Sequence, residues 1–267
     1  MKIRFINSLV INRELWLRLT EREILGRYRG SALGILWSFI TPLAMLAVYT
    51  FVFSQVFKAR WGSLEEAGPL GFAINLFAGL IVFNLFSECI NRAPSLICMN
   101  PNYVKKVIFP LETLGSVAVG NAGFHALTSL TILLLFELLA MHYIPLTILW
   151  LPLVWIPLIL LSMAGTWLLS AAGVFIRDIG QLVSVALNML MFLSPIFFPV
   201  SALPERWQPI LKLNPLAVII EQTRLVSVQG VNPEPLYLAV GIPAGLIVCE
   251  LSFRAFQKSK KAFADVL

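Results

Sequence analysis

In this chain of 267 residues, 58% of the residues are hydrophobic and only 13% are charged, whereas soluble domains have about 25% charged residues. The net charge of +6 does not require a nucleic-acid partner, because basic residues also flank membrane spans on the cytoplasmic side. Cys89, Cys98 and Cys249 lack metal-ligand spacing, and their odd number excludes a complete disulfide framework. We predict a single all-α, polytopic membrane domain over residues 1–267.

The first 30 residues are rich in Arg and Glu, which argues against both a cleavable signal peptide and a membrane span. On a helix, the apolar residues of 5–29 share one arc and most charged residues lie opposite, although Arg13 interrupts the apolar arc. We predict a cytoplasmic amphipathic helix over 1–30 in the membrane interface. A solvated helix beside the membrane is the alternative.

Six stretches are long and apolar enough to cross a bilayer, which takes about 20 mostly apolar residues. Spans one to five occupy 33–200, and a cytoplasmic tail at 257–267 follows the sixth span. The predicted spans are 33–57, 72–90, 114–141, 148–176, 182–200 and 236–256.

The segment 201–235 is moderately apolar but contains five prolines. Its apolar side chains, including Trp207, Leu213 and Leu216, would not sit comfortably in water. We predict a re-entrant external hairpin of two short helices. The break should fall at Asn214–Pro215, because proline disfavours helix in the residue before it.

The distribution of basic residues predicts the orientation. With six spans both termini lie on one side, and that side holds 15 of the 20 Lys and Arg residues. Because basic residues concentrate in cytoplasmic loops, both termini are expected in the cytoplasm.

The sequence lacks the motifs of an enzyme. The nearest approach to a phosphate-binding loop, GSVAVGNA at 115–122, has no Lys and lies in an apolar span. His125 and His142 are isolated, which excludes a multi-His metal site, and no Ser/His/Asp set is evident. We therefore predict a protein that is not an enzyme and binds no cofactor or metal. Energy for any work would come from a partner or an ion gradient.

Three carboxylates lie in apolar stretches, where charge is costly and often functional. Glu250 precedes Arg254 by four residues and can pair with it on one helix face. Glu137 lies near a helix end, within reach of the interface, so that Glu88 alone is well placed to face an internal cavity. An ion-coupled transporter usually needs more buried polar groups than this.

Aromatic residues are frequent in spans one, two and five. Taken singly, each is better explained by lipid-facing packing or an interfacial belt. Together they could form a ring that lines a sugar-conducting channel, because aromatic faces stack on the apolar faces of pyranose rings. The candidate channel aromatics are Trp37, Tyr49, Phe53, Phe83, Phe86, Phe192, Phe197 and Phe198.

Four stretches, in order and in register, carry a resemblance that covers nearly the whole chain. They are RYRGSALGILWSFITPL (27–43), VKKVIFPLE (104–112), VFIRDIGQLV continuing to MFLSPIFFP (174–199), and LPERWQPILKLNPLAVIIEQTR (203–224). The chain resembles the type-2 ABC exporter permeases, in particular those that export O-antigen and related polysaccharides.

The resemblance implies a bacterial inner-membrane permease that pairs with a second copy of itself and with two ATP-binding subunits. ATP and magnesium would bind to those subunits, and the substrate would be a polyprenyl-pyrophosphate-linked glycan. Membrane lipid would be a further partner. Related exporters of teichoic acid, capsule or small molecules stay open as alternatives. So do an ion-coupled secondary transporter and a membrane scaffold without transport.

Two sets of residues are assigned on this basis. Arg27, Tyr28 and Arg29 lie at head-group depth and are predicted to bind the pyrophosphate, although general attraction to anionic lipid explains them equally well. Lys105 and Lys106, with Arg177 and Asp178, are predicted to couple the permease to the ATPase. The alternative for the lysines is ordinary cytoplasmic positive charge.

Overall fold

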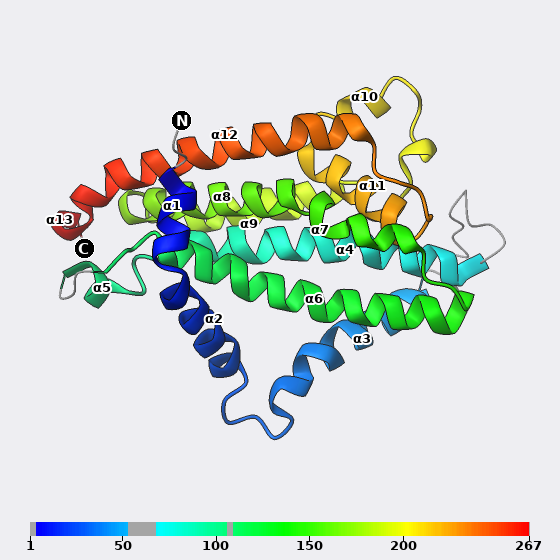
Figure 1. Cartoon of the computed structure of the whole chain (residues 1–267), viewed down its shortest axis with the longest axis horizontal. Coiled ribbons are helices and arrows are strands. Elements are labelled where there is room, and N and C mark those ends of the chain that lie inside the picture. Colours follow the sequence, from blue (N-terminus) through cyan, green and yellow to red (C-terminus); the bar gives the residue numbers. More distant parts are fainter. Residues whose placement is uncertain (1–3, 53–67, 106–108, 267) are drawn as a thin grey trace.

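The computed structural model describes residues 4–52, 68–105 and 109–266, and every regular element in these ranges is a helix. The longest helices run side by side, roughly along one axis (Figure 1). Short 3₁₀ helices join several of them: η1 Gly34–Leu36, η4 Ala93–Ser95, η5 Leu146–Trp150, η6 Val200–Ala202 and η7 Lys260–Ala262. The α-helices are α1 Arg4–Ile11, α2 Arg13–Arg27, α3 Trp37–Phe51, α4 Gly68–Arg92, α5 Pro101–Lys105, α6 Thr113–Met141, α7 Leu151–Val154, α8 Ile156–Phe175, α9 Ile179–Phe192, α10 Gln208–Leu211, α11 Pro215–Ser227, α12 Pro235–Ser259 and α13 Phe263–Val266.

Five of the six predicted spans correspond to helices that are long and apolar enough to cross a membrane. The exception is the fifth span, predicted over 182–200, because α9 has 14 residues and ends at Phe192. At 1.5 Å per residue, α9 covers about 21 Å of a hydrocarbon core about 30 Å thick. The five long segments are Gly34–Phe51, Leu70–Ser95, Thr113–Leu139, Leu146–Phe175 and Pro235–Val266.

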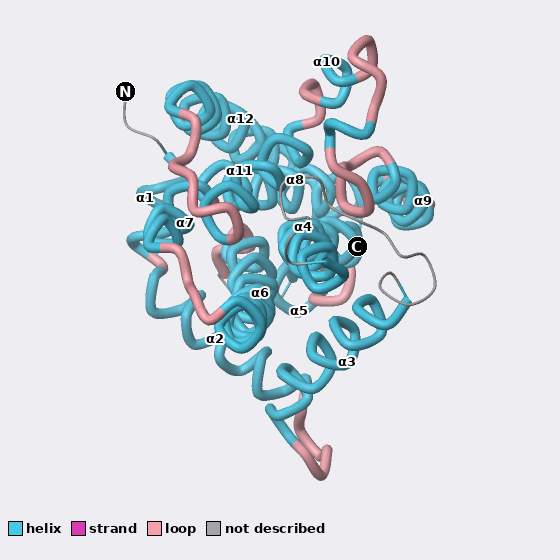
Figure 2. The backbone as a smooth tube through the Cα atoms, turned by 90° about the vertical axis from the view of Figure 1, so that its right-hand side faces the viewer, coloured by secondary structure: helices cyan, strands magenta, loops and turns pink. Residues whose placement is uncertain are grey.

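Helix α4 lies at the centre of the bundle, with α3, α6 and α9 around it (Figure 2). Every residue from Gly71 to Phe83 is buried. A helix that is apolar on all sides is stable only when other helices or lipid cover it. This stretch of α4 is therefore covered by protein rather than by lipid.

Helix α8 comes very close to the turn after α4. A Cβ atom added at Gly173 would lie 2.1 Å from the carbonyl oxygen of Pro94. Because that atom belongs to the backbone of η4, only glycine permits this approach. The end of α8 is also joined to the C-terminal helix, since the Phe175 and Phe263 rings have centroids 6.0 Å apart.

The N-terminal segment is two helices rather than the single helix predicted over 1–30. The chain breaks at Asn12, whose side-chain amide donates to the Ser8 carbonyl at 2.9 Å. Both helices run across the long ones (Figure 1). The Phe5 amide donates to Glu250 on α12, and Thr20 of α2 lies against Gly120 of α6. Ile6, Val10, Leu17 and Leu25 remain exposed, and their contact with a membrane stays a prediction.

The predicted external segment contains two short helices, α10 and α11, with the break at Asn214–Pro215. Asn214 is extended and its side chain accepts from the Leu216 amide at 3.0 Å, so it caps α11. The apolar side chains of the segment differ in burial: Leu216 is buried, whereas Trp207 and Leu213 are exposed. Whether the pair dips into the membrane stays a prediction. In Figure 1 it lies at the end of the bundle opposite α5, α13 and the C-terminus.

Candidate functional site

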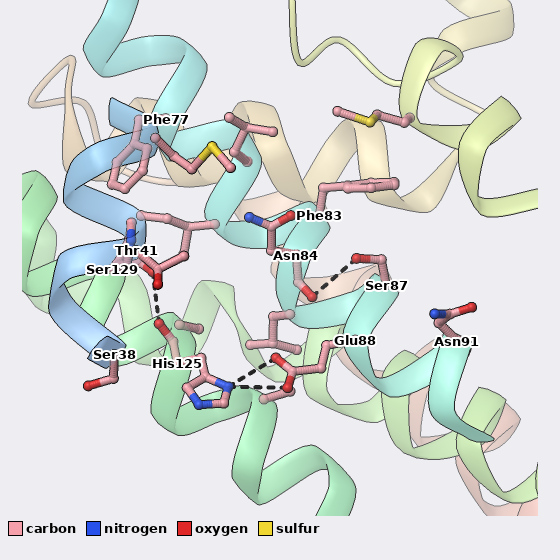
Figure 3. A pocket seen from close by; sticks show the side chains of 18 of the residues that line it. Ser38, Thr41, Phe77, Phe83, Asn84, Ser87, Glu88, Asn91, His125 and Ser129 are labelled. Atoms are coloured by element: carbon pink, nitrogen blue, oxygen red, sulfur yellow. Dashed lines mark hydrogen bonds and ion pairs between the residues drawn. The ribbon is translucent and has the colours of Figure 1, made fainter. Parts of the chain in front are cut away.

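A cavity of about 680 Å³ lies between α3, α4, α6 and α9, with the end of α2 at its edge. Figure 3 shows polar side chains pointing into it from several helices. The lining combines aromatic rings with amides, hydroxyls and a few charged groups. The aromatic and polar lining residues are Arg27, Tyr28, Trp37, Ser38, Thr41, Tyr49, Phe77, Phe83, Asn84, Ser87, Glu88, Asn91, His125, Ser129, Ser184 and Asn188.

Only some of the eight candidate channel aromatics line the cavity. Trp37, Tyr49 and Phe83 line the cavity, and Phe77, which was not predicted, joins them. Phe53 lies outside the described residues. The other four lie elsewhere: Phe86 packs half-buried in the core, Phe192 stacks on Phe197 with centroids 5.9 Å apart, and Phe198 is half-buried after α9.

The three predicted head-group residues also separate. Arg27 is the last residue of α2 and Tyr28 its C-cap, and both line the cavity. Arg29 is exposed and does not line it. The chain turns sharply after them, and Gly30 has a φ of +85°, which residues with side chains rarely adopt. The turn keeps Arg27 and Tyr28 at the cavity and leads into α3.

Glu88 of α4 faces the cavity, as predicted, and groups from two other elements converge on it. Arg27 Nη1 donates to Glu88 Oε1 at 2.6 Å. His125 Nδ1 of α6 lies 3.2 and 3.1 Å from the two carboxylate oxygens, and Asn121 Nδ2 lies 3.4 Å from Oε1. The Tyr28 hydroxyl lies 3.2 Å from His125 Nε2. Figure 3 shows the Glu88–His125 contact at the cavity wall.

These distances indicate where the hydrogens lie. With two carboxylate oxygens near His125 Nδ1, that nitrogen carries a hydrogen and donates it. In the neutral tautomer Nε2 is then an acceptor for the Tyr28 hydroxyl. Burial raises the pKa of the Tyr28 phenol above its ordinary value; Arg27 opposes this shift and Glu88 adds to it. Tyr28 is therefore a hydrogen-bond donor at neutral pH.

The other two intramembrane carboxylates lie away from the cavity. Glu250 pairs with Arg254 Nε at 2.7 Å, as expected from their spacing. Glu137 is only 1% exposed and is covered by protein. Within the described residues neither of its oxygens has a hydrogen-bond partner. In the same ranges, no three His, Cys, Asp or Glu side chains group as a metal site would need.

The residues assigned to coupling lie at the surface. Lys105, at the end of α5, is exposed, and so are Arg177 and Asp178 between α8 and α9. Lys106 lies outside the described residues. Because Phe175 contacts Phe263, the α8–α9 turn lies near the C-terminal helix.

Arg224 of α11 is one of the five basic residues outside the predicted cytoplasmic set, and its side chain is fully buried. Its Nε donates to the Asn75 carbonyl of α4 at 2.8 Å. Its Nη1 and Nη2 donate to the carbonyls of Pro195 and Ile196 at 2.6 and 3.0 Å. Glu221 Oε1 accepts from Nη1 at 2.8 Å. Arg224 therefore joins α11 to α4 and to the turn after α9.

Sequence reasoning missed His125, Asn121 and Arg224. His125 was set aside because no second histidine stands near it in sequence. The signal that could have found it is the antiparallel pairing of α4 with α6, which brings it to Glu88 across 37 positions. That register depends on packing between the two helices, and the sequence of either helix alone does not determine it.

Comparison with known proteins places this architecture among transporters. A family model described as ABC-2 type transporter matches residues 14–226. The O-antigen export system permease protein RfbA of Klebsiella pneumoniae is 25% identical over 256 residues, 95% of each chain. Its namesake from Myxococcus xanthus is 26% identical over 267 residues, 98% of this chain and 99% of the relative. The polysialic acid transport protein KpsM of Escherichia coli is 26% identical over 78% of this chain and 79% of its own.

Proposed function

Because this chain belongs to the ABC-2 type transporter family, we propose that it is the membrane-spanning subunit of an exporter of lipid-linked polysaccharide. Membership in the family implies an ATP-binding partner subunit. ATP and magnesium then bind to that partner. The permease itself catalyses no reaction; it supplies the path across the bacterial inner membrane.

The single observation that carries the substrate class is the lining of the cavity. Trp37, Tyr49, Phe77 and Phe83 offer aromatic faces that stack on the C–H faces of sugar rings. Amides and hydroxyls between them, such as Asn84 and Asn188, can exchange hydrogen bonds with successive sugar hydroxyls. A path with repeated weak contacts suits a long glycan that has to slide. The names of the RfbA relatives point to the same substrate.

The carrier's diphosphate binds at the edge of this cavity. Arg27 and Tyr28 lie there, on the turn between the crossing helix α2 and α3. Arg presents a planar fork of donors that matches two phosphate oxygens at once, and Tyr28 adds a hydroxyl donor. Arg29, exposed beside them, contributes attraction to the anionic head-group region rather than a direct contact.

A second copy of the chain completes the channel. Met45 of α3 and Asn188 of α9 line the cavity yet are exposed in the single chain. Phe192 and Leu193, at the end of α9, are also exposed and apolar. A partner molecule packed on α3 and α9 would cover these residues and enclose the cavity between two permeases.

We place both termini in the cytoplasm, with the α10–α11 pair re-entering from the opposite side. In this arrangement α9 and the turn that follows it form the fifth crossing, which α9 alone is too short to make. α5 and the α8–α9 turn then face the ATPase. Lys105, Lys106, Arg177 and Asp178 dock onto it there.

The proposal is tested with a matched pair of tryptophans. Trp37 lines the cavity and is 43% exposed, whereas Trp150 lies outside it and is 44% exposed. In cells that depend on this permease, Trp37→Ala should lower surface polysaccharide and leave lipid-linked polysaccharide inside the cell. Trp37→Phe should restore export and Trp150→Ala should change nothing. Normal polysaccharide export by cells that lack the permease altogether would contradict the proposal.

A capsule glycan is the second candidate substrate, because the KpsM relatives are named for polysialic acid transport. The polymer that accumulates in cells carrying Trp37→Ala distinguishes the two candidate substrates. Accumulation of O-antigen on its lipid carrier supports the first candidate. Accumulation of a capsular polymer supports the second, and efflux of a small molecule with neither polymer retained would point to another substrate class.

A further inference from the structure

The Glu88 carboxylate lies where an anionic ligand would be bound. Donors from two helices converge on it: Arg27 at the end of α2, and His125 and Asn121 on α6. The Tyr28 hydroxyl lies on the far side of the His125 ring. A carboxylate and a phosphate accept hydrogen bonds from the same kind of donor, often through paired oxygens. The donors that hold Glu88 are therefore the donors that a diphosphate would use.

The side chains that hold Glu88 are exposed enough for a ligand to replace Glu88 as their hydrogen-bond partner. The side chains of Arg27 and Glu88 are 52% and 27% exposed and both line the cavity. A ligand in the cavity can therefore reach Arg27 without unfolding any helix. Glu88 neutralises Arg27 when the cavity is empty, which lowers the cost of holding a positive charge close to the membrane interior.

A purely structural role, in which Glu88 only fastens α2 to α4, does not account for the position of Glu88 at the cavity. One turn earlier on α2, Glu23 already pairs with Arg92 of α4, and neither residue lines the cavity. The two ion pairs join the same two helices, but only the Arg27–Glu88 pair faces the space where a substrate would lie. This contrast separates a binding role for Glu88 from a purely structural one.

We propose that Glu88 is an internal counter-anion that occupies the diphosphate position of the empty permease, and that His125 is a second residue of this anion site. This inference rests on the proposed function. When a prenyl diphosphate enters, its oxygens take the donors of Arg27, Tyr28 and His125, while Glu88 withdraws to Asn121. The repulsion between Glu88 and the bound diphosphate keeps binding moderate, so that the ligand can leave again.

The test uses the full permease–ATPase complex in nanodiscs of neutral lipid, with farnesyl diphosphate as the probe and farnesol as the uncharged control. Glu88→Gln keeps the size and an acceptor oxygen but removes the competing charge. It should bind farnesyl diphosphate about tenfold more tightly than wild type, because a like charge next to the ligand is gone. His125→Gln should bind it more weakly, and farnesol should distinguish none of the variants.

Glu23→Gln is the matched control, since it breaks the other α2–α4 ion pair outside the cavity. It should leave the dissociation constant of farnesyl diphosphate unchanged. Glu88→Asp is the second variant, for use if Glu88→Gln does not assemble. Its carboxylate is one methylene further from Arg27, so binding should tighten, but by less than with Gln.

The outcomes separate the inference from the function on which it rests. Equal or weaker binding of farnesyl diphosphate by Glu88→Gln, with wild type binding normally, overturns the counter-anion role and leaves the proposed function standing. Failure of wild type and all variants to distinguish farnesyl diphosphate from farnesol overturns the diphosphate site itself. Tighter binding by Glu88→Gln with unchanged binding by Glu23→Gln supports the inference.

Discussion

Two arginines in this molecule show how differently the fold uses the same side chain. Arg27 lies at the cavity edge, half exposed, and its partner is the side chain of Glu88. Arg224 of α11 is fully buried, and three of its partners are the backbone carbonyls of Asn75, Pro195 and Ile196.

The difference in partners indicates a difference in role. Side chains can rotate away and give their place to a ligand, whereas backbone carbonyls within a helix or a tight turn cannot move without moving the chain. Burial adds to this, because a buried charged group is costly unless its partners stay in place. The Arg27 region is therefore suited to binding and release, and the Arg224 region is suited to holding α11, α4 and the turn after α9 together.

The largest effect is expected at Arg224. Arg224→Met would leave three buried carbonyls without their donor and should destabilise the protein by about 3 kcal/mol. The measurement is thermal unfolding of the purified permease in detergent. Arg206→Met removes an exposed arginine from the same segment, 201–235, and should not shift the transition. Equal stability of the two variants would remove the distinction between the two arginines.

The next largest effect is expected where α8 meets η4. Gly173→Ala places a methyl group against the Pro94 carbonyl oxygen, which the backbone of η4 cannot easily avoid. Overpacking of this kind should cost about 2 kcal/mol in the same unfolding measurement. Gly123→Ala in α6 is the control, because nothing lies within 4 Å of its new Cβ atom. Alanine there should be neutral or stabilising, and comparable losses at both glycines would argue against the close approach.

Substitution at the cavity edge should alter transport rather than stability. Arg27→Lys together with Arg29→Lys keeps both charges but removes the guanidinium fork, and should lower export of the lipid-linked glycan about tenfold. Membrane insertion and complex assembly should be unchanged. Because only Arg27 lines the cavity, Arg27→Lys alone should reproduce most of the loss and Arg29→Lys alone should have little effect. Wild-type surface polysaccharide in the double variant would favour general attraction to anionic lipid.

A smaller effect is expected at the surface formed by α5. Lys105→Glu together with Lys106→Glu reverses charge on the segment proposed to dock onto the ATPase, and should lower export several-fold while ATP hydrolysis continues. Export and ATPase activity are measured together in membranes that contain the complex. Lys258→Glu with Lys261→Glu makes the same charge change in the C-terminal tail and serves as the control. If the Lys105→Glu, Lys106→Glu variant shows unchanged export and unchanged recovery of the complex, the two lysines are explained by ordinary cytoplasmic positive charge.

The smallest effect concerns the surface of the α10–α11 pair. Leu213 is 82% exposed in the single chain and Leu216 is 1% exposed. If the pair enters the membrane, cysteine at either position should react slowly with a bulky aqueous reagent, at 213 because of lipid and at 216 because of protein. Exposed Cys98 is first replaced by serine, since it would otherwise react. Fast labelling at 213 would place the segment in water.

Several features of the fold follow from sequence because they depend on local chemistry. Long apolar stretches predict helices in a membrane protein, because only helices and closed barrels satisfy every backbone group there. The break at Asn214–Pro215 follows from proline sterics. The Glu250–Arg254 pair follows from the spacing of four residues on one helix. Each of these conclusions requires only neighbouring residues.

Other features were decided by contacts between residues far apart in the chain. The residues around Asn12 do not predict that the N-terminal helix divides there. The division allows α1 to contact α12 while α2 lies on α6. The sequence likewise could not show that Trp37 and Tyr49 line a cavity while Phe86 packs in the core. Which face of a helix is covered depends on its neighbours, and every face of an apolar membrane helix looks alike in sequence.

The sequence by itself determined the class of protein, the positions of five long apolar helices and the residues able to carry charge. Only the tertiary structure decided that Arg224 is buried while Arg27 is open, and that His125 meets Glu88 across 37 positions. The physical reason is that hydrophobicity is a property of each segment, whereas burial and the pairing of charges are properties of the register between helices. That register is set by packing across the whole bundle.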